Sequence, residues 1–145
     1  MENDRSVDTL RRHQDAALRV LAQGSAVLAQ GQAALLDQSA GLRQELMQVL
    51  AAYQAFKHDV IFDPAIASGN AERAALAREM KVHCIAAGEV FRGHMMQWTP
   101  ARIAGDWASY KVAARLTISQ LHRHILAERA GIAELLNRYG DREAA

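Results

Sequence analysis

The sequence of 145 residues is poor in several residue types, and each scarcity excludes a class of protein. A single cysteine, Cys84, cannot build a disulfide framework or a zinc site of several cysteines. With only 2 prolines and 6% aromatic residues, the composition argues against a β-sandwich, which would need many β-branched residues and frequent turn signals. Half of the residues are hydrophobic, which argues against disorder. These observations predict one all-α domain over residues 1–145.

Strong net charge and long hydrophobic runs are also missing. The formal net charge is +1, so no basic field indicates a nucleic-acid partner. No stretch reaches the 18 or so consecutive apolar residues of a membrane span, and the polar N-terminus lacks the apolar segment of a signal peptide. We therefore expect a cytoplasmic protein that contacts neither membrane nor nucleic acid.

Turn and capping signals divide the chain into four long helical stretches. The first begins near Ser6, and either Gly31 or the segment 37–41 ends it. The second runs from about 39–42 to Phe62, where Asp63-Pro64 stops it. The third, with Asn70 as its N-cap, covers 71–98, and a connector covers 101–105. The fourth, which Asp106 can cap, runs to about 139, before Gly140. Four long helices with short connections predict an antiparallel up-down-up-down four-helix bundle.

Apolar residues recur in each stretch with the spacing of one helix face. Each inward stripe contains a histidine. The predicted stripes are Leu10, His13, Ala17, Val20, Gly24 and Val27; Met47, Ala51, Gln54, His58 and Phe62, with Leu46, Leu50, Tyr53 and Ile61 beside them; Leu76, Met80, His83, Ala87, Val90 and Trp98; and Ala114, Thr117, Leu121, His124, Glu128 and Ile132.

These four histidines are also expected at one height in the bundle. In an antiparallel hairpin, residues equidistant from the turn lie level with each other. The midpoint of His13 and His58 falls near the first turn, that of His58 and His83 near the second, and that of His83 and His124 inside the connector. The spacing therefore predicts a histidine layer.

Glu128 adds a carboxylate to this layer, because it follows His124 by one helical turn, about 6 Å along the axis. Imidazole and carboxylate together suit iron, manganese or zinc. A metal-free layer of polar core residues, hydrogen-bonded to one another or to water, is the alternative. His94 and His122 are expected away from this layer, and Cys84 is expected to be a small buried hydrophobe, with a redox role as a minor option.

The order of these residues resembles the hemerythrin-like, or HHE cation-binding, domain. The segments that carry the resemblance are Leu10-Arg11-Arg12-His13, Phe56-Lys57-His58-Asp59 and Leu121-His122-Arg123-His124-Ile125-Leu126-Ala127-Glu128. Glu79-Met80, Phe91, Trp98 and Asp106-Trp107 further resemble a bacterial subset of that family.

The resemblance implies a four-helix bundle with a non-haem di-iron centre that binds O2 or senses oxygen, iron or redox state. The ligands it implies here are His13, His58, His124 and Glu128, with His83 as a looser match. The family's carboxylate in the second helix would fall at Phe62. Asp59 and Asp63 are nearby but point elsewhere, although Asp63 could turn inward at the helix end. Without that carboxylate two cations are costly to bury, so we expect a mononuclear, weakened or lost site.

Two functions follow from these expectations. The first is a hemerythrin-like iron-binding protein, with O2 or a similar small ligand at an open coordination position. The alternative is a metal-free bundle that has lost the metal site and acts by contact with a protein partner or as a homodimer. An enzyme is not expected, because no catalytic triad order, phosphate-binding loop or paired carboxylates are found.

Overall fold

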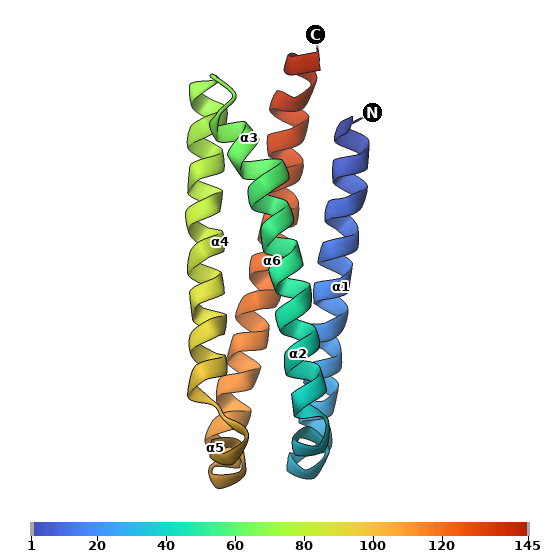
Figure 1. Cartoon of the computed structure of the whole chain (residues 1–145), viewed down its shortest axis with the longest axis vertical. Helices are drawn as coiled ribbons and strands as arrows, with labels where there is room; N and C mark the ends of the chain where they lie inside the picture. Colours follow the sequence, from blue (N-terminus) through green and yellow to red (C-terminus); the bar gives the residue numbers. More distant parts are fainter. Residues whose placement is uncertain (1, 145) are drawn as a thin grey trace.

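The computed structural model describes the backbone of residues 2–144 and the side chains of residues 5–138. Regular structure in this range is entirely helical, which confirms the all-α class. Four long helices, α1 (Glu2–Gln30), α2 (Gln32–Phe56), α4 (Ala71–Gln97) and α6 (Trp107–Ala144), lie side by side in Figure 1. Shorter segments are the π-helix η1 (Lys57–Phe62), α3 (Asp63–Ile66) and α5 (Pro100–Gly105). Both chain ends lie at the end of the molecule opposite α5 (Figure 1).

The first turn is made by Gly31 alone. Its φ of 114° lies in a region that side chains with a Cβ rarely adopt, so glycine is suited to this position. The helix α2 therefore starts at Gln32, earlier than the predicted 39–42, and the segment 37–41 is helical. Of the two breaks that the sequence offered, Gly31 is the one used.

The prediction that Asp63-Pro64 stops the second helix is wrong. The chain remains helical through η1 and into α3, which ends at Ile66. Pro64 lies at the start of α3, where a missing backbone N–H is tolerated because the first donors of a helix lack partners. In η1 the backbone N–H of Asp63 bonds to the carbonyl of His58, five residues earlier, and this wider turn changes the direction of the side chains that follow.

The boundaries of α4 and α5 agree closely with the prediction. Asn70 caps α4, since its side-chain oxygen accepts a hydrogen bond from the backbone N–H of Arg73 at 3.1 Å. Thr99 caps α5 in the same way by accepting from the backbone N–H of Arg102 at 3.3 Å. The connector around 101–105 is thus a short helix, as expected.

The last helix, α6, is longer than predicted. Asp106 caps its start by accepting from the backbone N–H of Ser109 at 3.2 Å. The helix continues past the predicted end near residue 139 to Ala144. Gly140 lies inside it, because a glycine costs a helix only about 1 kcal/mol and no proline follows.

Two buried clusters form the core. The larger one follows the middle of the bundle and the end where α3 lies, and the smaller one lies near α5 and includes Val27, Leu35, Trp98 and Ile103. α1 packs on α2 and on α6, and α4 packs on α6. No helix within the described residues has the length and apolar character needed to cross a membrane.

The predicted inward faces of the first and fourth stretches are correct, but those of α2 and α4 are rotated. Met47 and Val90, placed in the core by the prediction, are 55% and 51% exposed. In α4 the inward row instead passes through Ala77, Cys84 and Phe91, which are seven residues apart and buried. Because one residue turns a helix by about 100°, this row carries His83, the neighbour of Cys84, away from the core.

Candidate functional site

The structure does not gather the four predicted histidines. His13 is half-buried against the rings of Tyr53 and Phe56, and His58 packs on Phe62 at a ring distance of 5.6 Å. His83 is exposed. The remaining two predicted ligands, His124 and Glu128, do meet, with Nε2 of the histidine 3.2 Å from Oε1 of the carboxylate.

One further side chain joins His124 and Glu128. Among the residues whose side chains are described, Cys84, His124 and Glu128 form the group of three ligand-type side chains whose atoms lie within 4.8 Å of one another. Cys84 comes from α4, and the other two come from α6. The expectation that Cys84 is buried in the core is confirmed, and its sulfur also accepts a hydrogen bond from a polar group, the ammonium of Lys57.

The ammonium of Lys57 lies between Cys84 and Glu128. Its Nζ lies 2.7 Å from Oε2 and 2.8 Å from Oε1 of Glu128, and donates to Sγ of Cys84 at 3.1 Å. It also lies 3.9 Å from the centroid of the Tyr53 ring. The side chains of Lys57 and Glu128 are 3% and 5% exposed, so this is a fully buried ion pair. Two opposite charges are thus held where water cannot screen them.

A chain of hydrogen bonds connects this ion pair to the surface. The hydroxyl of Tyr53 donates to Oε1 of Glu128 at 3.0 Å and accepts from the side-chain amide of Gln14 at 3.1 Å. The amide oxygen of Gln14 accepts from Arg129 at 3.0 Å, and Arg129 pairs with Asp15 at 2.8 Å. The network therefore joins α1, α2 and α6 and provides partners for a buried amide, hydroxyl and carboxylate.

The electrostatics of this network favour the ionised form of Glu128 and the protonated form of His124. Burial alone would raise the pKa of Glu128, but its contacts with His124 and the charge of Lys57 lower it below the ordinary value. Burial alone would lower the pKa of His124, but its polar contacts with Cys84 and Glu128 raise it to about 9. Burial and the charge of Glu128 raise the pKa of Tyr53, so its hydroxyl stays a proton donor.

The carboxylates near His58 do not reach the interior. Phe62 is fully buried at the position where the resemblance would place a carboxylate, while Asp59 and Asp63 are exposed. Asp63 pairs with Lys81 at 2.7 Å on the surface, so the expectation that it could turn inward is wrong. Burial lowers the pKa of His58, and the charges of Lys81 and Lys57 add to this effect.

These residues do not fit a hemerythrin-like di-iron centre. Such a centre needs bridging carboxylates to neutralise two cations, and Glu128 is the one predicted ligand that supplies a carboxylate. Both of its oxygens already bind an ammonium. The histidines at positions 13, 58 and 83 are not part of the ligand-type group around it.

Sequence reasoning missed the role of Lys57, Tyr53 and Gln14. The sequence does indicate that Lys57 faces inward, because it follows Tyr53 by four residues and precedes Ile61 by four. It therefore continues the apolar line through Leu50, Tyr53 and Ile61 on one helix face. A lysine on such a line needs a buried partner, and Glu128 is the partner that the fold supplies.

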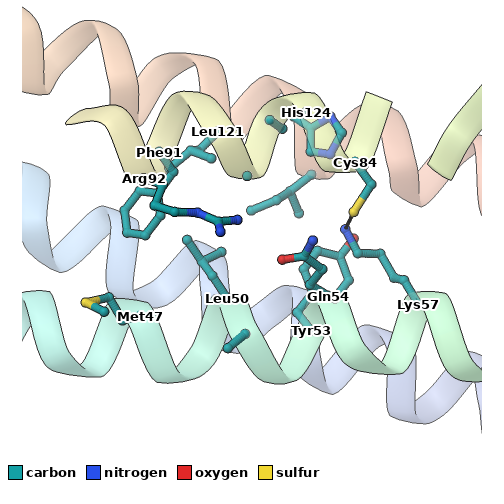
Figure 2. Close-up of a pocket in the computed structure, with 14 residues that line it drawn as sticks. Met47, Leu50, Tyr53, Gln54, Lys57, Cys84, Phe91, Arg92, Leu121 and His124 are labelled. Atoms are coloured by element: carbon teal, nitrogen blue, oxygen red, sulfur yellow. Dashed lines mark hydrogen bonds between the residues drawn. The ribbon is translucent and has the colours of Figure 1, made fainter. Parts of the chain in front are cut away.

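A cavity of about 390 Å³ lies beside the ion pair, between α2, α4 and α6. Figure 2 shows Tyr53, Gln54 and Lys57 entering it from one side and Cys84, Phe91 and Arg92 from the other. Its walls are mostly apolar, and polar groups are confined to a few side chains. This combination is typical of a small-molecule site.

Comparisons of the chain with family models, with curated proteins and with solved structures find no match.

Proposed function

We propose that this protein is a metal-free four-helix bundle with up-down-up-down connectivity that acts by binding another molecule rather than by iron chemistry. The observation that carries the proposal is the contact of Nζ of Lys57 with both oxygens of Glu128, at 2.7 and 2.8 Å. An ammonium and a metal cation compete for the same carboxylate. In this bundle the lysine supplies the positive charge that a metal ion would otherwise bring.

The cost of burying charge supports this reading. Removing an ionised group from water is expensive unless an opposite charge and hydrogen bonds replace the water. Lys57 donates to two oxygens of Glu128 and to Cys84, and Tyr53 donates to the same carboxylate. A metal ion would have to displace the ammonium from this set and leave it without an acceptor.

Metal loading tests the proposal directly. The protein is incubated anaerobically with Fe(II), passed through a desalting column and analysed for iron, with melting temperatures recorded before and after. We expect less than about a tenth of an equivalent of iron and an unchanged melting temperature, because a ligand that does not bind the native state cannot stabilise it. Retention of one equivalent with a rise of several degrees would overturn the proposal.

An iron-binding function is the second candidate, and the proximity of Cys84, His124 and Glu128 is the observation that favours it. Three ligand-type atoms within 4.8 Å could hold one cation if Lys57 moved away. This function predicts that wild-type protein binds Fe(II) or Zn(II) and that Cys84→Ala weakens the binding. The metal-free proposal predicts no binding by either form.

A further inference from the structure

The cavity beside the ion pair has an apolar body and a polar region. Leu50, Phe91, Leu121 and Ile125 form much of its wall, contributed by α2, α4 and α6. At the volume that a water molecule takes in the liquid, about 30 Å³, its 390 Å³ would hold roughly a dozen non-hydrogen atoms. An apolar molecule of that size would remove these walls from water, which is favourable in proportion to the area covered.

The charged groups that line the cavity are all basic. Lys57 and Arg92 line it together with His124, and no aspartate or glutamate among the described residues does so. Glu128 binds Lys57 but is not part of the lining, and Glu89 contacts Arg92 at 3.3 Å from an exposed position. The charge of Lys57 is balanced by Glu128, so Arg92 is the lining group that offers positive charge to an anionic ligand.

Two polar side chains converge above Gly88. A Cβ placed on this glycine would lie 3.7 Å from both amide atoms of Gln54 and 3.9 Å from Nη2 of Arg92. Within the described residues the amide of Gln54 has no hydrogen-bond partner, although it is half-buried. In Figure 2 the side chains of Gln54 and Arg92 extend toward one another across the cavity. The absence of a side chain at Gly88 leaves room for a small acceptor group between them.

We propose that this cavity binds a small monocarboxylate with an apolar chain of about ten carbons. The carboxylate accepts hydrogen bonds from Arg92 and the amide N–H of Gln54 above Gly88, and the chain covers Leu50, Phe91 and Leu121. The inference rests on the proposed function, since a metal ion in place of the Lys57 ammonium would change the charge of the wall.

Calorimetric titration with three probes of equal chain length tests this inference. Sodium decanoate is expected to bind one per chain with a Kd of about 10–300 µM, a range suited to a dozen non-hydrogen atoms. 1-Decanol, which lacks the charge, should bind at least about tenfold more weakly, and decyltrimethylammonium should not bind. Absence of decanoate binding, or equal binding of the alcohol, would overturn the inference.

Two glycines of α4 provide a matched pair of variants. Gly88→Leu places a side chain in the cavity and should weaken decanoate binding at least tenfold. Gly93→Leu adds the same side chain to the same helix at an exposed position with open space around it, and should leave the Kd unchanged. Far-UV circular dichroism checks that both variants fold. Equal decanoate affinity in the two would contradict the site.

The head-group contact has its own pair. Arg92→Gln should weaken decanoate binding about tenfold and leave the weaker affinity for 1-decanol unchanged. Arg78, which is exposed on the same helix and does not line the cavity, provides the control: Arg78→Gln should change neither affinity. Iron analysis of the same samples separates the two proposals. Iron retention would overturn the metal-free function even if decanoate binds, and failure to bind decanoate in iron-free protein would overturn only the cavity inference.

Discussion

At the scale of single residues, Lys57 sets the charge of the bundle interior. Its ammonium bridges the carboxylate of Glu128 and the sulfur of Cys84 and lies over the Tyr53 ring. Without the ammonium, Glu128 would keep only the Tyr53 hydroxyl and His124 as polar partners. The ion pair thus couples helix α6 to the junction between α2 and η1. Variants that remove one or both of its partners measure its contribution to the free energy of unfolding.

We expect Lys57→Met to destabilise the protein by about 3–5 kcal/mol, because buried Glu128 loses the ammonium that binds both of its oxygens and keeps only His124 as a counter-charge. The double variant Lys57→Met/Glu128→Leu should recover most of this loss, since the buried charge is then gone as well. Chemical denaturation gives both values. Lys81→Met breaks the exposed pair with Asp63 and serves as control, with an expected change below about 1 kcal/mol. If Lys57→Met lost as little stability as the control, the buried ion pair would not be needed for the stability of the fold.

His124 should make stability depend on pH in the alkaline range. Its folded pKa of about 9 lies above the ordinary value near 6.5, so the protonated ring stabilises the native state. This contribution is complete below about pH 6.5 and is lost as the pH rises through about 9. Glu128, Lys57 and Cys84 face the ring, so the effect reflects the whole group.

Melting temperatures from pH 6 to 10 should therefore fall in wild-type protein by a few degrees more than in His124→Gln. His122→Gln, an exposed change on the same helix, should follow the wild-type curve. NMR titration of the ring protons provides a direct value for the His124 pKa. Parallel curves for wild type and His124→Gln would show that the ring does not carry the effect.

At the scale of elements, the turn at Gly31 and the π-helix η1 decide which side chains face inward. Gly31 sets where α2 begins, and η1 changes the phase of the helix between Lys57 and Phe62. The sequence pattern identified the caps at Asn70 and Asp106, because a polar cap before a helical run is a local signal. A π-turn has no comparable local signal, so the path through Pro64 was missed.

Two glycines in the first half of the chain should respond oppositely to alanine. Gly31→Ala forces a Cβ into a backbone with φ of 114° and should cost about 1–2 kcal/mol. Gly41→Ala lies inside α2 at an exposed position with open space, and should stabilise by about 0.5–1 kcal/mol. Urea denaturation measures both changes. Stabilisation by Gly31→Ala would show that the turn is made differently.

At the scale of the whole molecule, three of the long helices contribute to both core clusters. α1, α2 and α6 contribute residues to both clusters, and Trp98, which directly follows α4, belongs to the cluster near α5. Neither cluster can then lose its helices without disturbing the other. The bundle should unfold as one cooperative unit, which is also the test of the single-domain prediction.

Trp98 and Trp107 both belong to the cluster near α5, so tryptophan fluorescence reports on that end while far-UV circular dichroism reports on all helices. We expect the two thermal midpoints to agree within about 1 °C. The Trp107→Phe variant is the control. It removes the signal of the half-buried Trp107 ring and leaves the fluorescence of the buried Trp98. Fluorescence midpoints several degrees below those of circular dichroism would indicate separate unfolding units.

The sequence by itself determined the helical class, the boundaries of α4 and α5, the start of α6, the inward faces of α1 and α6 and the meeting of His124 with Glu128. These properties depend on composition, local caps and spacing within one helix, all of which can be read from the order of the residues. Only the tertiary structure decided that α4 presents Cys84 rather than His83, and that Lys57 rather than a histidine layer meets Glu128. Those outcomes depend on helix rotation, which the π-turn and the packing of all four helices set together. A rotation of one residue, about 100°, exchanges one set of inward side chains for another.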